Sequence, residues 1–368
     1  MKYLSEYRDA DIVAQYMDEI GRTATRPWTI MEVCGGQTHS LVKNGLLQML
    51  PDNVRMVHGP GCPVCVTPLY QIDKAVHLAE NHGVILCSYG DMLRVLGSKH
   101  SLLESKAAGA DVRILYSPLE AVKIAQENPT KEVVFFAVGF ETTAPANALS
   151  VLHAQRAGVK NYSILTSHVL VPPAIEAVMN DDDSFIQGFL AAGHVCAIMG
   201  VSEYYPLSEK YKIPLVVTGF EPVDLVQGIL MVVRQLEKGE HKLENQYSRI
   251  VHPEGNHEAR KILEQVFEVS DREWRGIGNI PMSGYELRSE FSAYDANIKF
   301  DVNIEKVSES PECIAGLVLK GIKKPHECPQ FGKKCTPQSP LGAPMVSSEG
   351  ACAAYYHFSN MLETIDEI

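Results

Sequence analysis

The chain has 368 residues, of which 45% are hydrophobic and 21% charged, and its formal net charge is −12. This length exceeds what one hydrophobic core usually supports, the composition is too apolar for a disordered protein, and the acidic balance argues against a nucleic-acid partner. No apolar run approaches the ~20 residues of a membrane span, and residues 1–8 lack the apolar stretch of a secretory signal, so we expect a cytoplasmic protein with no membrane partner.

Apolar β-rich runs and segments with helical periodicity alternate from the N-terminus to about residue 240. After a helix expected at residues 9–22, strands are expected at Trp28–Val33, Val54–His58, Val84–Ser88, Val112–Tyr116, Val133–Val138, Ser163–Ser167, Val195–Met199 and Leu215–Thr218. Helices are expected between them, including Leu69–Asn81, Leu119–Asn128, Ala146–Ala157 and Val223–Leu236. This alternation predicts an α/β fold with parallel sheets, because a helical crossover returns the chain to a parallel strand.

The pattern changes near residue 240, where prolines, glycines and late cysteines replace the regular alternation. We therefore expect two parallel-sheet α/β domains, residues 1–118 and 119–239, and a smaller irregular C-terminal domain, residues 240–368. Glycine-containing turns follow several of the strands, and Gly-Phe-Glu occurs at both 139–141 and 219–221. Ligands of open α/β sheets bind at the carboxyl ends of strands, so we expect the chemistry at these turns.

Three of the nine cysteines follow the first two expected strands. Cys34 lies where a strand leads into a helix, and the helix dipole there favours an anion, so we expect a metal-binding thiolate of lowered pKa. His39, about one helical turn later, is a candidate proton acceptor beside it. Cys62 and Cys65 form a C-x-x-C, which can cycle between dithiol and disulfide or bind a soft metal. Because the two strands are neighbours, both turns are expected at one edge of the sheet.

A second group of four cysteines lies near the C-terminus, at Cys313, Cys328, Cys335 and Cys352. Their long, unequal spacings differ from the paired knuckles of structural zinc sites and favour an iron–sulfur cluster over zinc or unligated core thiols. Cys87 and Cys196 lie inside apolar runs and are expected to fill the core. An odd number of cysteines in a cytosolic protein argues against a disulfide framework.

Together these motifs resemble the HypD family of maturation factors for NiFe hydrogenases. The resemblance covers nearly the whole chain and rests on residues 34–39, 59–65, 88–92 and 139–145 and on the four late cysteines. It implies three domains, one of which carries a 4Fe-4S cluster held by Cys313, Cys328, Cys335 and Cys352. It further implies that Cys34 binds iron while the Fe(CN)2CO group is assembled, with Cys62 and Cys65 as a thiol exchange pair.

The same resemblance implies two partners, a HypC-type chaperone whose cysteine shares the iron with Cys34 and a HypE-type carrier that supplies cyanide. The hydrogenase large subunit would receive the product. Many members of the family have histidine where this chain has Gln37. Glu141, Thr142 and His168 are secondary candidates for the wall of the cleft. A cluster-dependent thiol–disulfide reductase and a zinc-stabilised interaction protein stay open as alternatives.

Overall fold

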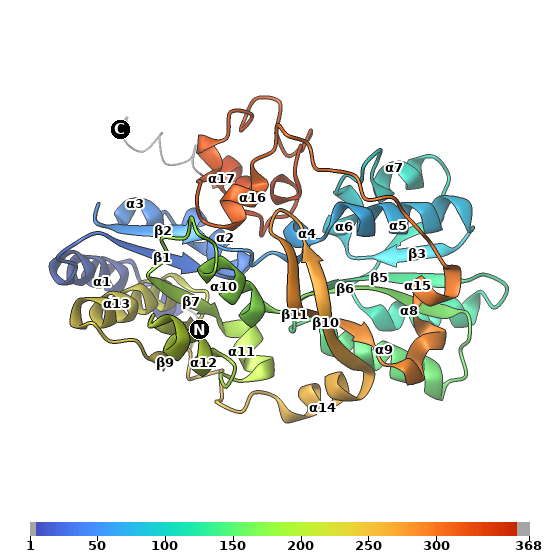
Figure 1. Ribbon diagram of the computed structural model, residues 1–368, viewed down its shortest axis with the longest axis horizontal. Helices are drawn as coiled ribbons and strands as arrows, with labels where there is room; N and C mark the ends of the chain where they lie inside the picture. Colours follow the sequence, from blue (N-terminus) through green and yellow to red (C-terminus); the bar gives the residue numbers. More distant parts are fainter. Residues whose placement is uncertain (1–4, 359–368) are drawn as a thin grey trace.

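The computed structural model describes residues 5–358, and on one side of it lies a five-stranded parallel sheet, sheet A, with the order β2-β1-β7-β8-β9 (Figure 1). Its strands are β1 (Trp28–Glu32), β2 (Val54–His58), β7 (Gly188–Ala192), β8 (Leu215–Thr218) and β9 (Leu243–Asn245). One face is covered by α1 (Ala10–Thr23), α2 (Gly35–Lys43), α3 (Leu46–Met49) and α13 (Pro222–Lys238). The other face is covered by α10 (Val171–Met179), α11 (Gly193–Met199) and α12 (Tyr204–Tyr211).

A second parallel sheet, sheet B, has four strands in the order β4-β3-β5-β6. They are β3 (Ile85–Ser88), β4 (Val112–Ile114), β5 (Val133–Gly139) and β6 (Tyr162–His168). One face carries α8 (Pro118–Glu127) and α9 (Ala144–Arg156), and the other carries α5 (Leu69–Asn81), α6 (Gly90–Arg94) and α7 (Leu102–Ala107). The expected α/β class with two parallel sheets is confirmed, and β3, β5 and β6 are buried because helices cover both faces.

The two sheets are interleaved along the chain. β1 and β2 pair with the much later strand β7 and its neighbours, while β3 and β4 pair with β5 and β6. The boundary expected at residue 118 therefore falls inside sheet B, and the boundary expected at residue 239 falls before β9, the last strand of sheet A. The alternation of strands and helices could not reveal this order, because every strand of a covered parallel sheet appears as the same kind of buried apolar run.

Most of the expected elements agree with the structure, and β2, α5 and β8 match it residue for residue. The strand expected at Val195–Met199 is wrong, because these residues belong to α11, and the strand of this region is β7, which precedes it. A short apolar run carries too few residues to separate helical from strand periodicity.

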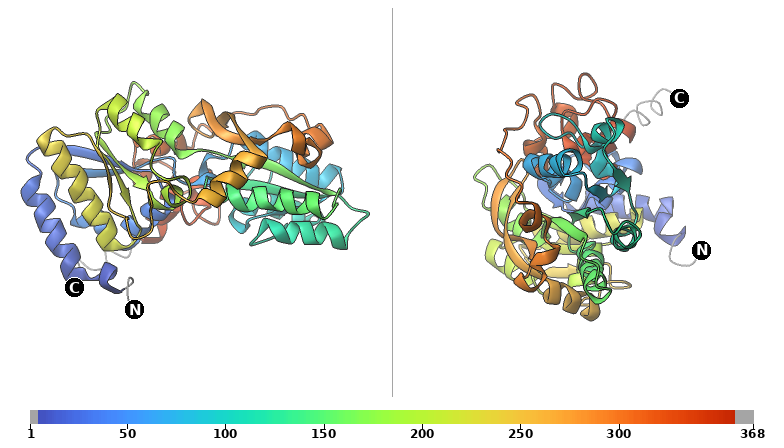
Figure 2. Two further views of the ribbon diagram at one scale, coloured as in Figure 1. Left: turned by 90° about the horizontal axis from the view of Figure 1, so that it is seen from below. Right: turned by 90° about the vertical axis from the view of Figure 1, so that its right-hand side faces the viewer.

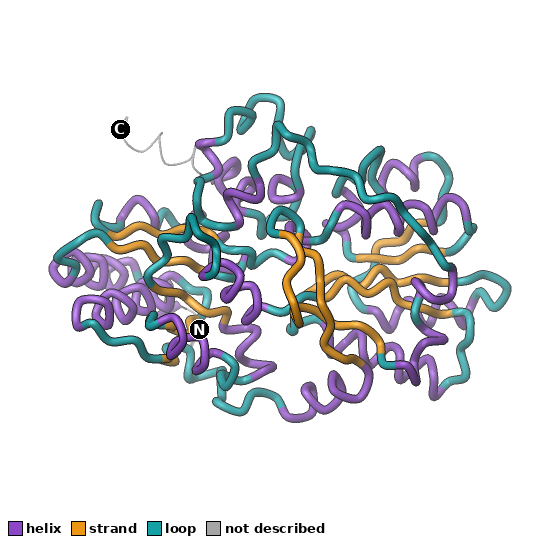
Figure 3. Tube along the Cα trace, viewed as in Figure 1, coloured by secondary structure: helices purple, strands orange, loops and turns teal. Residues whose placement is uncertain are grey.

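An antiparallel hairpin, β10 (Phe267–Trp274) and β11 (Gly278–Leu287), lies between the two sheets (Figures 1 and 3). It follows α14 (His257–Val266) and precedes η2 (Ser289–Tyr294) and α15 (Ala296–Phe300), and all of these pack on the side of sheet B. Leu170 N–H, at the start of α10, donates to the Ser283 carbonyl of β11 at 2.8 Å. The hairpin therefore connects elements of both sheets, which lie side by side in an elongated molecule (Figure 2).

A long segment without regular secondary structure runs from α15 to the C-terminal lobe, which comprises residues 311–358 (Figure 3). The lobe contains α16 (Ala315–Leu319), η3 (Pro325–Glu327), η4 (Ala343–Met345) and α17 (Ala351–Phe358). Two further short elements complete the fold, η1 (Ser5–Arg8) and α4 (Pro63–Val66). The helix α17 packs on α2, and η4 packs on α4, so the lobe sits over the turns that follow β1 and β2. Within residues 5–358, none of the helices has the length and apolar character that a membrane crossing requires.

Candidate functional site

The turns that carry Cys34 and Cys62 lie together at the carboxyl edge of sheet A. Cys34 follows β1 and Cys62 follows β2, and the two strands pair in parallel. Gly35 N–H donates to the Gly61 carbonyl at 2.9 Å, and a Cβ added at Gly61 would lie 2.3 Å from the Cys34 nitrogen. Only glycine permits this approach of the two backbones. The expectation that both turns open at one sheet edge is confirmed.

Cys62 and Cys65 form a disulfide at the two ends of one helical turn, with their Cα atoms 5.2 Å apart. Cys62 is the N-cap of α4, and Pro63 begins the helix, where a residue without an N–H is well tolerated. Both cysteines are buried. The helix contacts β5 of sheet B on one side and η4 of the C-terminal lobe on another. The disulfide therefore lies where the two sheets and the lobe meet.

Cys34 is half-buried at the N-terminus of α2, and an aromatic ring and an acidic residue pack against the two glycines that follow it. A Cβ added at Gly36 would lie 3.1 Å from the ring of Phe220 and 3.9 Å from Cys34 Sγ. The Phe220 ring also stacks on His194, with ring centroids 3.8 Å apart. On the other side, Glu349 of the C-terminal lobe packs directly against Gly35. The site thus contains residues from both ends of the chain.

Burial raises the pKa of Cys34 to about 12, and the carboxylate of Glu349 acts in the same direction. The backbone N–H groups of Gly36 and Gln37 lower the pKa, as expected at a helix N-terminus, but their effect is smaller. The expectation of a lowered pKa is therefore wrong for the free thiol, because the cost of burying a charge exceeds the helix contribution.

A buried hydrogen-bonded chain connects the Cys34 turn to the C-terminal lobe. Glu32 accepts hydrogen bonds from the backbone N–H of Cys34 at 2.9 Å and from the hydroxyl of Thr38. Its carboxylate also lies 2.7 Å from His58 Nδ1, and His58 Nε2 lies 3.0 Å from the hydroxyl of Tyr355 on α17. Sequence reasoning missed this chain, although a glutamate inside an apolar strand was a visible signal, since a buried carboxylate requires partners.

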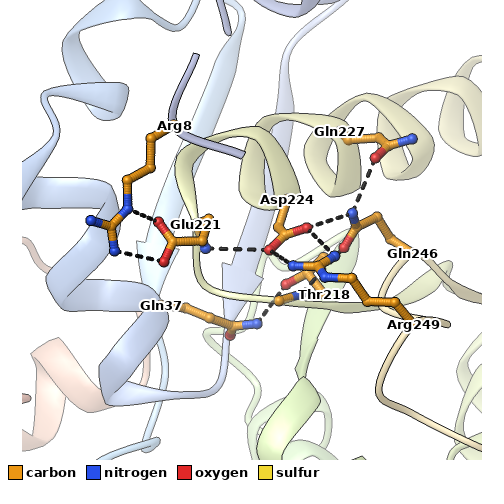
Figure 4. Close-up of polar contacts among 9 residues, drawn as sticks. Arg8, Gln37, Thr218, Glu221, Asp224, Gln227, Gln246 and Arg249 are labelled. Atoms are coloured by element: carbon orange, nitrogen blue, oxygen red, sulfur yellow. Dashed lines mark hydrogen bonds and ion pairs between the residues drawn. The ribbon is translucent and has the colours of Figure 1, made fainter. Parts of the chain in front are cut away.

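Gln37 and His39, which follow Cys34 on α2, form hydrogen bonds to different parts of the structure. Gln37 is fully buried, and its Nε2 donates to the Ala191 carbonyl at 3.1 Å and to Thr218 Oγ1 at 2.7 Å (Figure 4). His39 contacts the lobe, since its Nδ1 lies 3.0 Å from the Ser348 carbonyl. Gln37 therefore fixes α2 to the ends of β7 and β8, and His39 fixes α2 to the lobe.

An ionic network holds the turn between β8 and α13, which carries Phe220 (Figure 4). Both oxygens of the buried Asp224 accept hydrogen bonds from Arg249, at 2.7 and 2.6 Å. The Arg249 guanidinium also lies over the ring of Tyr7, 3.8 Å from its centroid. Arg8 donates to Glu221, the N-cap of α13, at 2.8 Å. The N-terminal segment thus helps to hold the second Gly-Phe-Glu turn against the Cys34 site.

The four late cysteines line one cavity, which we call the four-cysteine cavity. Its other walls are mainly apolar, and its lining includes Ile314, Ala315, Val318, Phe331, Leu341, Pro344 and Met345. Burial raises the pKa of Cys352, and the three other thiols raise it further. Within the part of the chain that the structure describes, no three His, Cys, Asp or Glu side chains cluster closely enough to hold a single metal ion. The structure thus brings together the four thiols that are widely separated in sequence.

The secondary candidates lie at the ends of β5 and β6. Burial raises the pKa of Glu141 to about 8, and Glu141 Oε1 accepts a hydrogen bond from Val171 N–H at 2.9 Å. Thr142 is half-buried in the same turn. Burial lowers the pKa of His168 to about 3, and its ring packs on Phe267 in the core beside sheet B. Both Cys87 and Cys196 are fully buried, as expected of core residues.

Comparison with known proteins places the chain among hydrogenase maturation factors. The family model described as "HypD: Hydrogenase formation hypA family" matches residues 11–359. The chain is 46% identical to hydrogenase maturation factor HypD2 of Bradyrhizobium diazoefficiens, over 97% of each chain. It is also 46% identical to the HypD proteins of Rhodobacter capsulatus and Escherichia coli, over 97% of this chain and 98% of each relative. The motifs, the fold and these matches agree, and the chain belongs to the HypD family.

Proposed function

We propose that this protein is a maturation factor for NiFe hydrogenases and that it is the scaffold on which the Fe(CN)2CO group is assembled. The observation that carries the proposal is the meeting of the Cys34 thiol, the Cys62–Cys65 disulfide and the C-terminal lobe at one junction. In this proposal Cys34 binds the iron as cargo. Low-spin iron with cyanide and carbonyl ligands favours thiolate over oxygen donors.

The surroundings of Cys34 support its role as an iron ligand. The Cys34 residue is half-buried, so part of it stays accessible. The cysteine of a HypC-type chaperone can approach from this accessible side as the second ligand of the iron. The amides of Gly36 and Gln37 favour negative charge at the sulfur once iron has displaced the proton. Because burial keeps the free thiol protonated, iron loading releases a proton, and loading becomes more favourable as the pH rises.

The four-cysteine cavity supports a 4Fe-4S cluster as the resident cofactor. Four thiols around one apolar cavity are the donor set and the environment that such a cluster requires. Cys313, Cys328, Cys335 and Cys352 would hold it. When bound, the cluster would accept and supply single electrons.

The disulfide supports an exchange of electrons near the iron. Reduction of the Cys62–Cys65 bond takes up two electrons and two protons and yields two thiols. The helix α4 contacts η4, and Pro344 and Met345 of η4 line the four-cysteine cavity. At its other end, α4 begins directly after the turn that packs on the backbone of Cys34. This position suits a dithiol pair that works between the two cysteine groups. A HypE-type carrier would supply cyanide, and the hydrogenase large subunit would receive the assembled group.

Infrared spectroscopy of protein isolated anaerobically with its natural partners tests the scaffold. We expect cyanide and carbonyl stretching bands in the wild-type complex and their loss in Cys34→Ala. Cys87→Ala is the matched control, because Cys87 is buried in β3 of sheet B and its variant should keep the bands. A well-loaded wild-type complex without these bands would overturn the scaffold.

A cluster-dependent thiol–disulfide reductase is the second candidate, and the disulfide at the junction is the observation that favours it. A reductase requires Cys62 and Cys65 but does not require Cys34. Full hydrogenase maturation by Cys34→Ala together with none by Cys62→Ala would therefore favour the reductase. Elemental analysis separates both from a zinc-stabilised interaction protein, since four irons per chain indicate a cluster and one zinc excludes it.

A further inference from the structure

The turn that joins β10 and β11 contacts the segments of both cysteine groups. The backbone N–H of Arg275 donates to the carbonyl of Val66 at 2.8 Å, and Val66 follows Cys65 in α4. A Cβ added at Gly276 would lie 2.7 Å from the Cα of Gly316, and Gly276 has a φ of +75°. Both features require glycine at this position. The turn is therefore held between the disulfide helix and the start of α16, which follows Cys313.

The side chain of Arg275 is buried at this junction. It is 8% exposed, and its Nη2 donates to Glu309 at 2.7 Å. Its buried Nη1 has no hydrogen-bond partner among residues 5–358. A buried N–H of a guanidinium without an acceptor costs free energy, so its position calls for a reason other than stability.

Arg275 lies beside a cysteine of the proposed cluster. Arg275, Glu309 and Cys313 line the same groove, which opens beside the four-cysteine cavity. The other cation of the groove, Lys320, is paired with Asp181 at 2.8 Å, and the one charged residue in the lining of the cavity is the acidic Glu312. Arg275 is paired too, with Glu309, but its side chain is only 7% exposed against 26% for Lys320, so water screens the charge of Arg275 less.

We propose that Arg275 is a positioning residue that raises the reduction potential of the 4Fe-4S cluster by stabilising the state that carries one additional electron. This inference rests on the proposed cluster. Four thiolates give the site a negative charge, and one further electron makes it more negative. A fixed cation in a medium of low dielectric constant attracts that added charge strongly. The backbone hydrogen bond from Arg275 to Val66 also fixes the position of this cation relative to the Cys62–Cys65 disulfide.

A potentiometric titration of the anaerobically purified full chain tests the inference. Dithionite serves as the one-electron donor, and the electron paramagnetic resonance signal of the reduced cluster gives the midpoint potential. We expect Arg275→Gln to lower the midpoint and Arg275→Lys to restore most of the shift. Glu309→Gln should raise the midpoint, because it removes the carboxylate that offsets the charge of Arg275.

Lys306→Gln is the matched control, since Lys306 is a cation near the same hairpin whose side chain is 65% exposed and paired with Glu273. Its charge is screened by water, so its loss should leave the midpoint unchanged. An unchanged midpoint in Arg275→Gln, or shifts of the same sign in Arg275→Gln and Glu309→Gln, would overturn the inference. If Arg275→Gln loses its iron, the Lys and Glu309 variants decide the question. Iron content of the wild type separates this failure from failure of the proposed cluster itself.

Discussion

Cys34 lies at a helix N-terminus, where two effects on its thiol oppose each other. The amides of α2 favour the thiolate, and burial with the nearby Glu349 favours the thiol. The position at a strand end was visible in the sequence, but the burial was not, because Phe220 and Glu349 come from segments more than a hundred residues away. The chemistry of a residue can be predicted from its neighbours in sequence only when its neighbours in space are the same.

Glu141 provides a prediction at the scale of one residue. Burial raises the pKa of Glu141 to about 8, so the folded protein keeps it protonated at pH values where the unfolded chain ionises it. Unfolding is therefore favoured increasingly as the pH rises from about 4.5 to about 8. Glu141→Gln removes this penalty and retains the acceptor for Val171 N–H. The variant should melt at a higher temperature than wild type at pH 7.5.

The pH series distinguishes this explanation from a change in packing. At pH 4 the melting temperatures of Glu141→Gln and wild type should lie close together, because the carboxyl is protonated in the folded state and largely so in the unfolded chain. A constant difference across the range would contradict the role assigned to ionisation. Glu264→Gln, on the exposed side of α14, is a suitable control and should show no such trend.

At the scale of elements, the sequence predicted most reliably where the strands end and the turns with the functional residues begin. The glycine-rich cysteine turns after β1 and β2 lie at one edge, as the parallel arrangement required. The apolar run of α11 was mistaken for a strand, because a short buried helix and a buried strand have the same composition. The hydrogen-bonded chain from Glu32 could not be seen in the sequence either, since His58, the partner of Glu32, lies on another strand, and Tyr355, the partner of His58, lies on α17.

The close approach of the two cysteine turns gives a prediction at this scale. Gly61→Ala would place a methyl group 2.3 Å from the Cys34 nitrogen, so the turns must separate. Overpacking of this kind costs roughly 1–3 kcal/mol, and we expect a lower temperature of thermal unfolding and loss of the iron binding that we propose for Cys34. Gly90→Ala is the control, because its methyl group would make only an ordinary contact with Ile114 at 3.7 Å. Equal melting temperatures for the two variants would contradict the expected clash.

At the scale of the whole molecule, the C-terminal lobe closes over a site built by the two sheets. The chain of Glu32, His58 and Tyr355 is one of its attachments, and the contact of His39 with Ser348 is another. Neither attachment could be predicted from spacing, since each joins residues roughly three hundred positions apart. Position and spacing identified the two cysteine groups and the family resemblance implied their roles, but neither carried information about how the lobe is held.

Tyr355→Phe tests the attachment of the lobe. The variant keeps the ring but leaves His58 Nε2 without the hydroxyl partner 3.0 Å away, which costs about 1–3 kcal/mol for a buried group. We expect faster amide hydrogen exchange in α17 and in the Cys34 turn, measured by mass spectrometry. Tyr356→Phe is the control, because that ring packs on Phe331, and its exchange should match wild type. Exchange that rises equally in both variants would indicate general loosening of α17 instead.

The interleaving of the two sheets has a consequence for synthesis on the ribosome. β1 and β2 are made early, but their partner β7 begins only at residue 188, and the edge strand β9 ends at residue 245. Sheet B, whose strands all lie between residues 85 and 168, can therefore complete its pairing first. Until β7 has been made, the nascent chain carries the apolar strands β1 and β2 without their partner. The thiols of Cys34, Cys62 and Cys65 follow the carboxyl ends of these two strands. Such an open edge is where chaperones bind and where premature oxidation or misassembly would begin.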